Sequence, residues 1–164
     1  MPKLPQAPGP GRRETPVDAT DRALLAELVS NSRISVRALA ERVHISRASA
    51  YARIERMLAE KTIRGFTARL DPARVGLGTT AYVTLSIDQA AWRALCQALR
   101  SVPYVDHFAL VGAEFDVLVL VRAPDNEALR DVVLRELQAL PGVRSSRTWL
   151  VFEEADGPGF TDQA

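Results

Sequence analysis

The sequence predicts an α+β protein of two domains, in which a winged helix-turn-helix unit precedes a ferredoxin-like βαββαβ unit. Two patterns carry this prediction. Residues 17–61 hold three segments with apolar residues at helical spacing, whereas residues 79–152 alternate strand-like and helix-like segments. The length of 164 residues suffices for two small domains that each bury a core.

The first 16 residues contain five prolines and two glycines. This composition cannot sustain a helix or bury a core, so we expect a disordered arm over residues 1–16. A first helix is expected over Val17–Ser30, where Asp18 can act as the N-cap and Asp21 follows three residues later. Its apolar stripe consists of Leu24, Leu25, Leu28 and Val29.

Two further helices and a tight turn are expected between Ser35 and Lys61. Ser35 and Ser46 can each cap a helix start, and apolar residues at helical spacing follow both. The turn position that commonly holds glycine, with φ above zero, is His44, which adopts that conformation more readily than most residues. Ala40 supplies the small side chain that close helix packing requires. Together these features favour a helix-turn-helix over a simple αα-hairpin with a solvated basic face.

The outer face of the second of these helices suits a DNA groove. It carries cations, hydroxyl groups, a phenol and small residues, with Glu55 the one acidic residue among them. An α-helix fits the major groove, where arginine can read guanine edges and serine or tyrosine can bond bases or phosphates. The expected DNA-binding residues are Ser46, Arg47, Ser49, Tyr51, Arg53 and Arg56. Among them, Arg56 is expected to contact phosphate together with Lys61.

The charge distribution supports a polyanionic partner for the N-terminal half. Residues 1–65 contain 12 Lys plus Arg and 7 Asp plus Glu, a net charge of +5, whereas residues 66–164 contain 9 and 13, a net charge of −4. The single cysteine, Cys96, excludes an internal disulfide and fits a reducing cytosol. No apolar run is long enough to span a bilayer. We therefore expect a cytoplasmic protein that binds double-stranded DNA and no membrane.

The segment after the helices alternates in the manner of a strand over Ile63–Leu70, until Asp71 and Pro72 stop it. We expect a wing or linker strand here. The predicted domains are therefore a helix-turn-helix domain over 17–65, a linker strand and loop over 66–78, a ferredoxin-like domain over 79–154 and a tail over 155–164.

The ferredoxin-like domain is predicted from the order of its segments. The expected strands are Thr79–Ile87, Tyr104–Val111, Phe115–Arg122 and Val143–Phe152, and the expected helices follow Gln89 and Pro124. The third strand is apolar on both faces, because Val117, Val119 and Val121 alternate with Leu118 and Leu120. The helices can cover only one face of the sheet, so we expect a second subunit to cover the other.

With both halves considered, the chain resembles the Lrp/AsnC family of bacterial and archaeal transcriptional regulators. The resemblance covers roughly Val17–Glu154. It rests on the segments VDATDRALLAEL, NSRISVRALAERVHIS, ARIERMLAEKTIRGFTARLDP, EFDVLVLVRAPD and LPGVRSSRTWLVFEE.

This resemblance implies a DNA-binding N-terminal domain and a C-terminal domain, often called RAM, that forms dimers and binds small effectors, typically amino acids. Together with the apolar sheet face, it favours a homodimer or a higher homo-oligomer, a tetramer or an octamer, and we expect no cofactor. The implied effector-binding residues are Gly112, Ala113, Glu114, Phe115 and Asp116. Ala113 replaces the family's usual glycine, and its methyl group could narrow or abolish the pocket.

Two alternative functions stay open at this point. The first is a nucleoid-associated protein without an effector, which would bind DNA mainly through phosphates. The second is an enzyme similar to sirohaem decarboxylases, which resemble this family in both domains. Its candidate residues are His107, Arg122, Arg144 and Arg147. Other enzyme classes are disfavoured, because no histidine or cysteine cluster has metal-ligand spacing and no nucleophile elbow or phosphate-binding glycine loop occurs.

Overall fold

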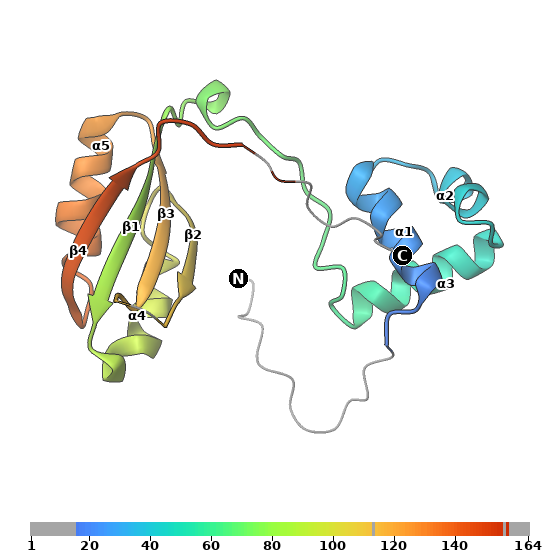
Figure 1. The fold of residues 1–164 in the computed structure, drawn as a ribbon, viewed down its shortest axis with the longest axis horizontal. Helices are drawn as coiled ribbons and strands as arrows, with labels where there is room; N and C mark the ends of the chain where they lie inside the picture. The colour runs from blue at the N-terminus through green and yellow to red at the C-terminus, as the bar shows by residue number, and fades with distance from the viewer. Residues whose placement is uncertain (1–15, 113, 156, 158–164) are drawn as a thin grey trace. The chain divides into compact units, whose positions relative to one another are not determined.

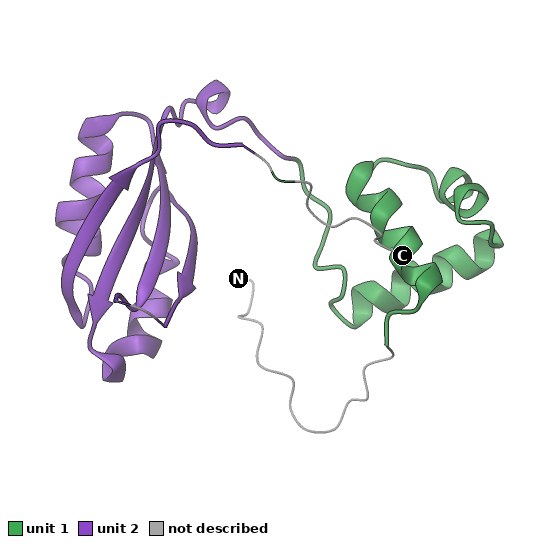
Figure 2. Cartoon of the chain, viewed as in Figure 1, with its two compact units in different colours: residues 1–68, 156–164 green, residues 69–155 purple. Residues whose placement is uncertain are grey.

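The computed structural model describes residues 16–112, 114–155 and 157, which form two compact units (Figure 2). One unit contains the three N-terminal helices, and the other spans Arg69–Ala155 and contains the sheet. The arm expected over 1–16 and the tail expected over 155–164 lie almost entirely outside the described residues. Among the described residues, no helix is both long and apolar enough to cross a membrane.

The first unit consists of α1 (Ala19–Ser30), α2 (Val36–Arg42) and α3 (Arg47–Ala59) (Figure 1). All three predicted N-caps are confirmed. Asp18 forms a reciprocal capping box with Asp21, in which each carboxylate accepts the other residue's backbone N–H. The Oγ atoms of Ser35 and Ser46 accept the N–H groups of the residues three positions later, at 3.2 and 3.1 Å.

A single apolar core joins the three helices. Its buried members are Leu24, Leu28, Leu39, Ala40, Ala50, Ile54, Met57 and Ile63. The turn between α2 and α3 passes through His44 with a φ of 56°, so the expected left-handed position is confirmed. The N–H of Ile45 then donates to the carbonyl of Ala40 at 3.0 Å, which closes the turn. The sequence therefore forms a helix-turn-helix because caps, turn and core agree.

The strand predicted over Ile63–Leu70 is wrong, because the structure has no strand between α3 and the sheet, a stretch in which every residue is described. Ile63 instead belongs to the helical core, and its N–H donates to the carbonyl of Met57 at 3.0 Å. Gly65, with a φ of 153°, and the exposed Phe66 follow. Alternation of apolar and polar residues shows only which side chains would share a face. A strand also needs a neighbouring strand that pairs with its backbone N–H and C=O groups, and this segment has none in the described part of the chain.

The second unit confirms the predicted βαββαβ order. Its elements are β1 (Thr79–Ile87), η2 (Gln89–Ala91), α4 (Trp92–Leu99), β2 (Val105–Leu110), β3 (Val117–Ala123), α5 (Asn126–Asp131), the π-helical η3 (Val132–Leu137) and β4 (Val143–Leu150), and the short 3₁₀ helix η1 (Ala73–Val75) precedes them. The antiparallel sheet has the order β2-β3-β1-β4 (Figure 1). Both predicted helices are α-helical over a shorter range than expected, since the 3₁₀ segment η2 precedes α4 and the π segment η3 follows α5.

Both helical segments pack on the same face of the sheet. Inward-facing side chains of β1 and β3, such as Val83 and Val119, form one buried cluster with Leu95 of α4 and Leu137 of η3. The opposite face has no helix of this unit against it. Cross-strand register puts Tyr82, Leu120 and Trp149 in one row on that face. Tyr82 and Trp149 are 36% and 59% exposed.

Candidate DNA-binding face and effector cavity

The side of α3 opposite the core defines the candidate DNA-binding face. Its exposed residues are Arg47, Ala48, Tyr51, Ala52, Glu55 and Ala59. The buried stripe of Ala50, Ile54 and Met57 lies on the other side of the helix and packs against α1 and α2. Because these two stripes lie on opposite sides of α3, the exposed stripe faces away from the helices against which the buried stripe packs.

Two predicted DNA-binding arginines lie on the flank of α3 and pair with carboxylates at the N-terminal end of α1, those of the N-cap Asp18 and of Asp21. Arg53 Nη1 lies 2.6 Å from Asp18 Oδ2 and 2.8 Å from Asp21 Oδ1. Arg56 Nη2 lies 2.5 Å from Asp21 Oδ2, while Arg56 Nη1 pairs with Glu60 at 3.2 Å. Asp21 is completely buried. We refer to Asp18, Asp21, Arg53 and Arg56 as the ionic cluster.

The ionic cluster lowers the pKa of both aspartates. Burial raises the pKa of Asp21, but hydrogen bonds from Arg53, from Arg56 and from the N–H of Asp18 outweigh it, so the pKa falls below 3.8. The hydrogen bond from Arg53 is the main reason that the pKa of Asp18 is also lowered. Both carboxylates are therefore ionised at neutral pH, and they engage the two guanidinium groups.

The remaining predicted DNA-binding residues form two groups: two serines at the start of α3, and two exposed residues without a partner among the described residues. Ser46 caps α3, and Ser49 is half-buried beside it. Arg47 and Tyr51 are exposed and form no ion pair or side-chain hydrogen bond with another described residue. The exposed alanines, Ala48 and Ala52, lie next to them on the same face. The sequence predicted small residues on this face, but which alanines are exposed depends on how the packed helix is oriented, and the structure shows that Ala48 and Ala52 are.

A second candidate site is a cavity of about 80 Å³ at one end of the sheet. It is lined by Thr84, Ser86, Glu114, Phe115, Ser145, Ser146 and Arg147. Of the five residues expected to bind an effector, Glu114 and Phe115 line it, Gly112 is exposed without lining it, and Ala113 lies outside the described residues.

Asp116, the fifth of these residues, does not line the cavity but forms hydrogen bonds with the strand that does. Its carboxylate accepts the N–H of Ile87 at 2.8 Å, and its own N–H donates to the carbonyl of Leu85 at 3.0 Å. These two bonds hold the β2–β3 loop against the end of β1, where a register shift lies between Ser86 and Ile87. Asp116 therefore positions Ser86 and the loop.

The sequence alone did not reveal the contribution of β4 to this cavity. Thr84 pairs with Arg147 and Ser86 pairs with Ser145 across β1 and β4, although each pair is about 60 residues apart in the chain. The pattern of hydroxyl residues in both strands was visible. Only the register shows that these residues face one another.

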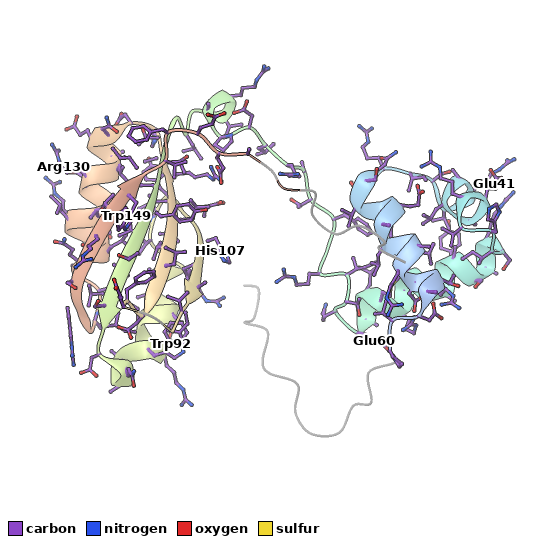
Figure 3. All side chains as sticks on the ribbon, viewed as in Figure 1. Glu41, Glu60, Trp92, His107, Arg130 and Trp149 are labelled. Atoms are coloured by element: carbon purple, nitrogen blue, oxygen red, sulfur yellow. The ribbon has the colours of Figure 1, made fainter. Side chains whose placement is uncertain are left out.

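The candidate enzyme residues do not gather at one place. His107 is exposed on the edge strand β2 (Figure 3). Arg122 pairs with Asp106 and Glu154, and Arg144 lies 3.8 Å from Asp88. Within the residues that the structure describes, no group of three or more His, Cys, Asp and Glu side chains could hold a metal ion.

Two family models match this chain. The AsnC-type helix-turn-helix domain matches residues 17–58, and the Lrp/AsnC ligand-binding domain matches residues 80–157. The first range contains the candidate DNA-binding face except Ala59, and the second contains the candidate effector cavity.

Individual relatives agree with the family models. The proline dehydrogenase transcriptional activator of Rhodobacter capsulatus is 36% identical over 140 residues, which are 84% of this chain and 91% of that protein. The leucine-responsive regulatory protein of Klebsiella pneumoniae is 31% identical over 84% of this chain and 86% of that protein. A transcriptional regulator of Neisseria meningitidis in complex with L-Met has a TM-score of 0.81 and 26% identity, over 89% of this chain and 96% of that chain. This chain therefore belongs to the Lrp/AsnC family and is a DNA-binding transcriptional regulator with a ligand-binding domain.

Proposed function

We propose that this regulator binds double-stranded DNA in the cytoplasm through the exposed face of α3 and that an amino acid, bound in the sheet domain, controls this binding. Its working form is a homodimer or a larger assembly of dimers, and it has no catalytic activity. Each dimer presents two α3 helices to half-sites about one helical turn of DNA apart, or a multiple of that spacing.

One observation carries the DNA-binding part of this proposal. On α3, Arg47 and Tyr51 project from an exposed face on which the neighbouring residues are alanines. Small side chains allow the helix backbone to approach the groove closely, so that the longer side chains reach base edges. We assign base contacts to Arg47 and Tyr51, and a positioning role to the Ser46 cap.

The ionic cluster changes the roles assigned to two arginines. Arg53 and Arg56 already have carboxylate partners, so DNA phosphates would have to compete with the buried, ionised Asp21. We therefore assign them to holding α3 on α1, with at most a secondary contact to phosphate from the exposed edge of Arg53.

The cavity fits a small zwitterion. Glu114 offers a negative charge for an ammonium group, Arg147 offers a positive charge for a carboxylate, and hydroxyl groups of β1 and β4 can bond either. The L-Met complex of the Neisseria relative supports an amino acid as the ligand class. Such an effector would act by binding one assembly or subunit arrangement more tightly than another.

The test is binding of the purified protein to a library of genomic DNA fragments, with and without each common amino acid. We expect enrichment of a palindromic site, and a change in enrichment with one amino acid. Arg47→Ala should weaken binding to that site by about 1 to 3 kcal/mol with relaxed base preference, whereas Arg130→Ala, an exposed arginine of α5 (Figure 3), should have no effect.

Two results would contradict the proposal in different parts. Uniform coating of all fragments, with affinity that falls steeply with salt, would indicate a nucleoid-associated protein instead. An effector response that survives in both Arg147→Ala and Glu114→Gln would place the ligand elsewhere. DNA binding would stand in the second case.

A further inference from the structure

We propose that Glu55 is a specificity-determining residue of the regulator, whose carboxylate accepts a hydrogen bond from the N4 amino group of a cytosine in the major groove. This inference rests on the proposed DNA-binding face of α3. It assigns a role to the acidic residue on that face, which the general attraction between cations and phosphates leaves unexplained.

The position of Glu55 is the first argument. It is exposed on the third turn of α3, four residues after Tyr51 and seven after Ala48. Residues at these spacings share one helix face. Ala48 and Ala52 extend no further than Cβ, so the two longest groups that project from the middle of this face are the Tyr51 phenol and the Glu55 carboxylate.

The absence of a partner is the second argument. The other three glutamates between residues 16 and 68 each pair with an arginine: Glu27 with Arg42, Glu41 with Arg37 and Glu60 with Arg56 (Figure 3 labels Glu41 and Glu60). Glu55 forms no ion pair or side-chain hydrogen bond with any residue that the structure describes.

Helix geometry explains why Glu55 has no partner on α3. Side chains three and four residues apart meet on a helix, and around Glu55 these positions hold no cation, but Tyr51, Ala52, Leu58 and Ala59. Arg53 and Arg56, the cations nearest to Glu55 in the sequence, lie on the flank of α3 and pair with Asp18 and Asp21. The fold keeps an acceptor-only group on the surface that meets a polyanion.

The chemistry of base edges identifies the partner. An ionised carboxylate only accepts hydrogen bonds, and near phosphates it is repelled, so it lowers affinity for DNA in general. In the major groove cytosine presents the N4 amino donor, whereas guanine presents two acceptors and thymine an acceptor and a methyl group. Adenine also presents an amino donor, N6, but its N7 acceptor lies beside it and repels a carboxylate, which favours cytosine. Glu55 therefore weakens binding to most sequences, and the affinity is highest for a site that has cytosine at the position facing Glu55.

The test is in vitro selection of DNA sites from a random library by the full-length protein, its Glu55→Ala and Glu55→Gln variants, and Glu127→Gln as a matched control. Glu127 is an exposed glutamate of α5, so this control removes the same charge from the other unit. Thermal unfolding of each variant checks that the fold is retained.

We expect the wild-type protein and Glu127→Gln to select cytosine at one position of each half-site. In the wild-type protein this preference for cytosine should be about 10- to 100-fold. In Glu55→Ala the preference should disappear, while the affinity for unrelated DNA rises. Glu55→Gln should shift the preference toward adenine, because a glutamine amide can bond adenine N6 and N7 together.

The inference is overturned if both Glu55 variants select the same bases as the wild type at every position, even if they bind all DNA more tightly. In that case Glu55 is only a repulsive surface charge, and the proposed function stands. If the wild-type protein selects no sequence at all, both the proposed function and this inference fail.

Discussion

Asp21 shows how one side chain can connect the start of a helix with the orientation of another. As the third residue of the first turn of α1, its carboxylate completes the capping box with Asp18, and its burial brings the same carboxylate against Arg53 and Arg56 of α3. The sequence predicts the capping role from spacing. The second role needs the packing of α1 on α3, because the partners lie 32 and 35 residues away.

Replacement of Asp21 should strongly destabilise the helical unit. Asp21→Ala removes the buried anion and leaves two guanidinium groups on the flank of α3 without their main partner. Since breaking a buried ion pair costs about 3 to 5 kcal/mol and both arginines keep some contact with water, we expect a loss of roughly 3 kcal/mol. Urea unfolding followed by circular dichroism measures it. A loss no larger than that caused by an exposed substitution such as Glu127→Gln would contradict the importance of the ionic cluster.

The ionic cluster also predicts sensitivity to acid. Both Asp18 and Asp21 have folded-state pKa values below the ordinary 3.8, so their contribution is present above that value and is lost as the pH falls through the folded-state pKa values. Stability of the helical unit should therefore decrease from about pH 5 downwards. Urea midpoints measured between pH 7 and pH 3 test this. In Asp21→Asn the decrease should be smaller, and an unchanged profile would argue against these two groups as its source.

At the scale of elements, backbone geometry decides where the sheet and its helices meet. Gly142, just before β4, has a φ of 79°, and its carbonyl accepts the N–H of Asp88 at 2.7 Å. A Cβ atom at this position would lie 2.3 Å from the Cβ of Ala91. The sequence shows only that Pro141 and Gly142 end a helix. The close approach to the β1–α4 connection depends on the fold.

Gly142→Ala should destabilise the sheet unit, because it combines backbone strain with a steric clash. Left-handed backbone costs an alanine about 1 kcal/mol and overpacking typically adds about 1 to 3 kcal/mol, so we expect roughly 3 kcal/mol in total. Gly76→Ala is the matched control. Gly76 also has a positive φ, 85°, but a Cβ there would meet no atom within 4 Å, so it should show the strain alone. Equal losses in the two variants, measured by urea unfolding, would mean that the contact with Ala91 relaxes.

At the scale of the whole molecule, the uncovered face of the sheet is the surface through which we expect the chain to assemble. Tyr82, Leu120 and Trp149 form an apolar row on the face opposite the helices. Tyr82 and Trp149 are exposed in this row, whereas Leu120 is buried. Exposed aromatic groups on an uncovered sheet face are typical of an interaction site, and a second copy of the same sheet provides a self-complementary partner. Dimer formation through this face stays a prediction.

Trp149→Lys should therefore weaken the homodimer. Trp149 is already more than half exposed within one chain, so its replacement should leave the fold of the sheet unit intact while it puts two charges into the expected interface. Analytical ultracentrifugation over a range of concentrations should show dissociation at concentrations where the wild type is dimeric, with unchanged circular dichroism. A variant that remains as tightly associated as the wild type would show that assembly uses another surface.

The sequence by itself determined the order of elements, the three N-caps, the left-handed turn at His44 and the family. These properties depend on local backbone chemistry and on hydrophobic spacing, which neighbouring residues specify. The tertiary structure alone decided that Arg53 and Arg56 pair with aspartates, that β4 contributes Arg147 to the cavity, that Ile63–Leu70 forms no strand and that Glu55 is left without a partner among the described residues. Each of these outcomes depends on whether a residue far away in the sequence packs against the side chain or segment in question. The spacing of neighbouring residues carries no information about the free energy of such a contact.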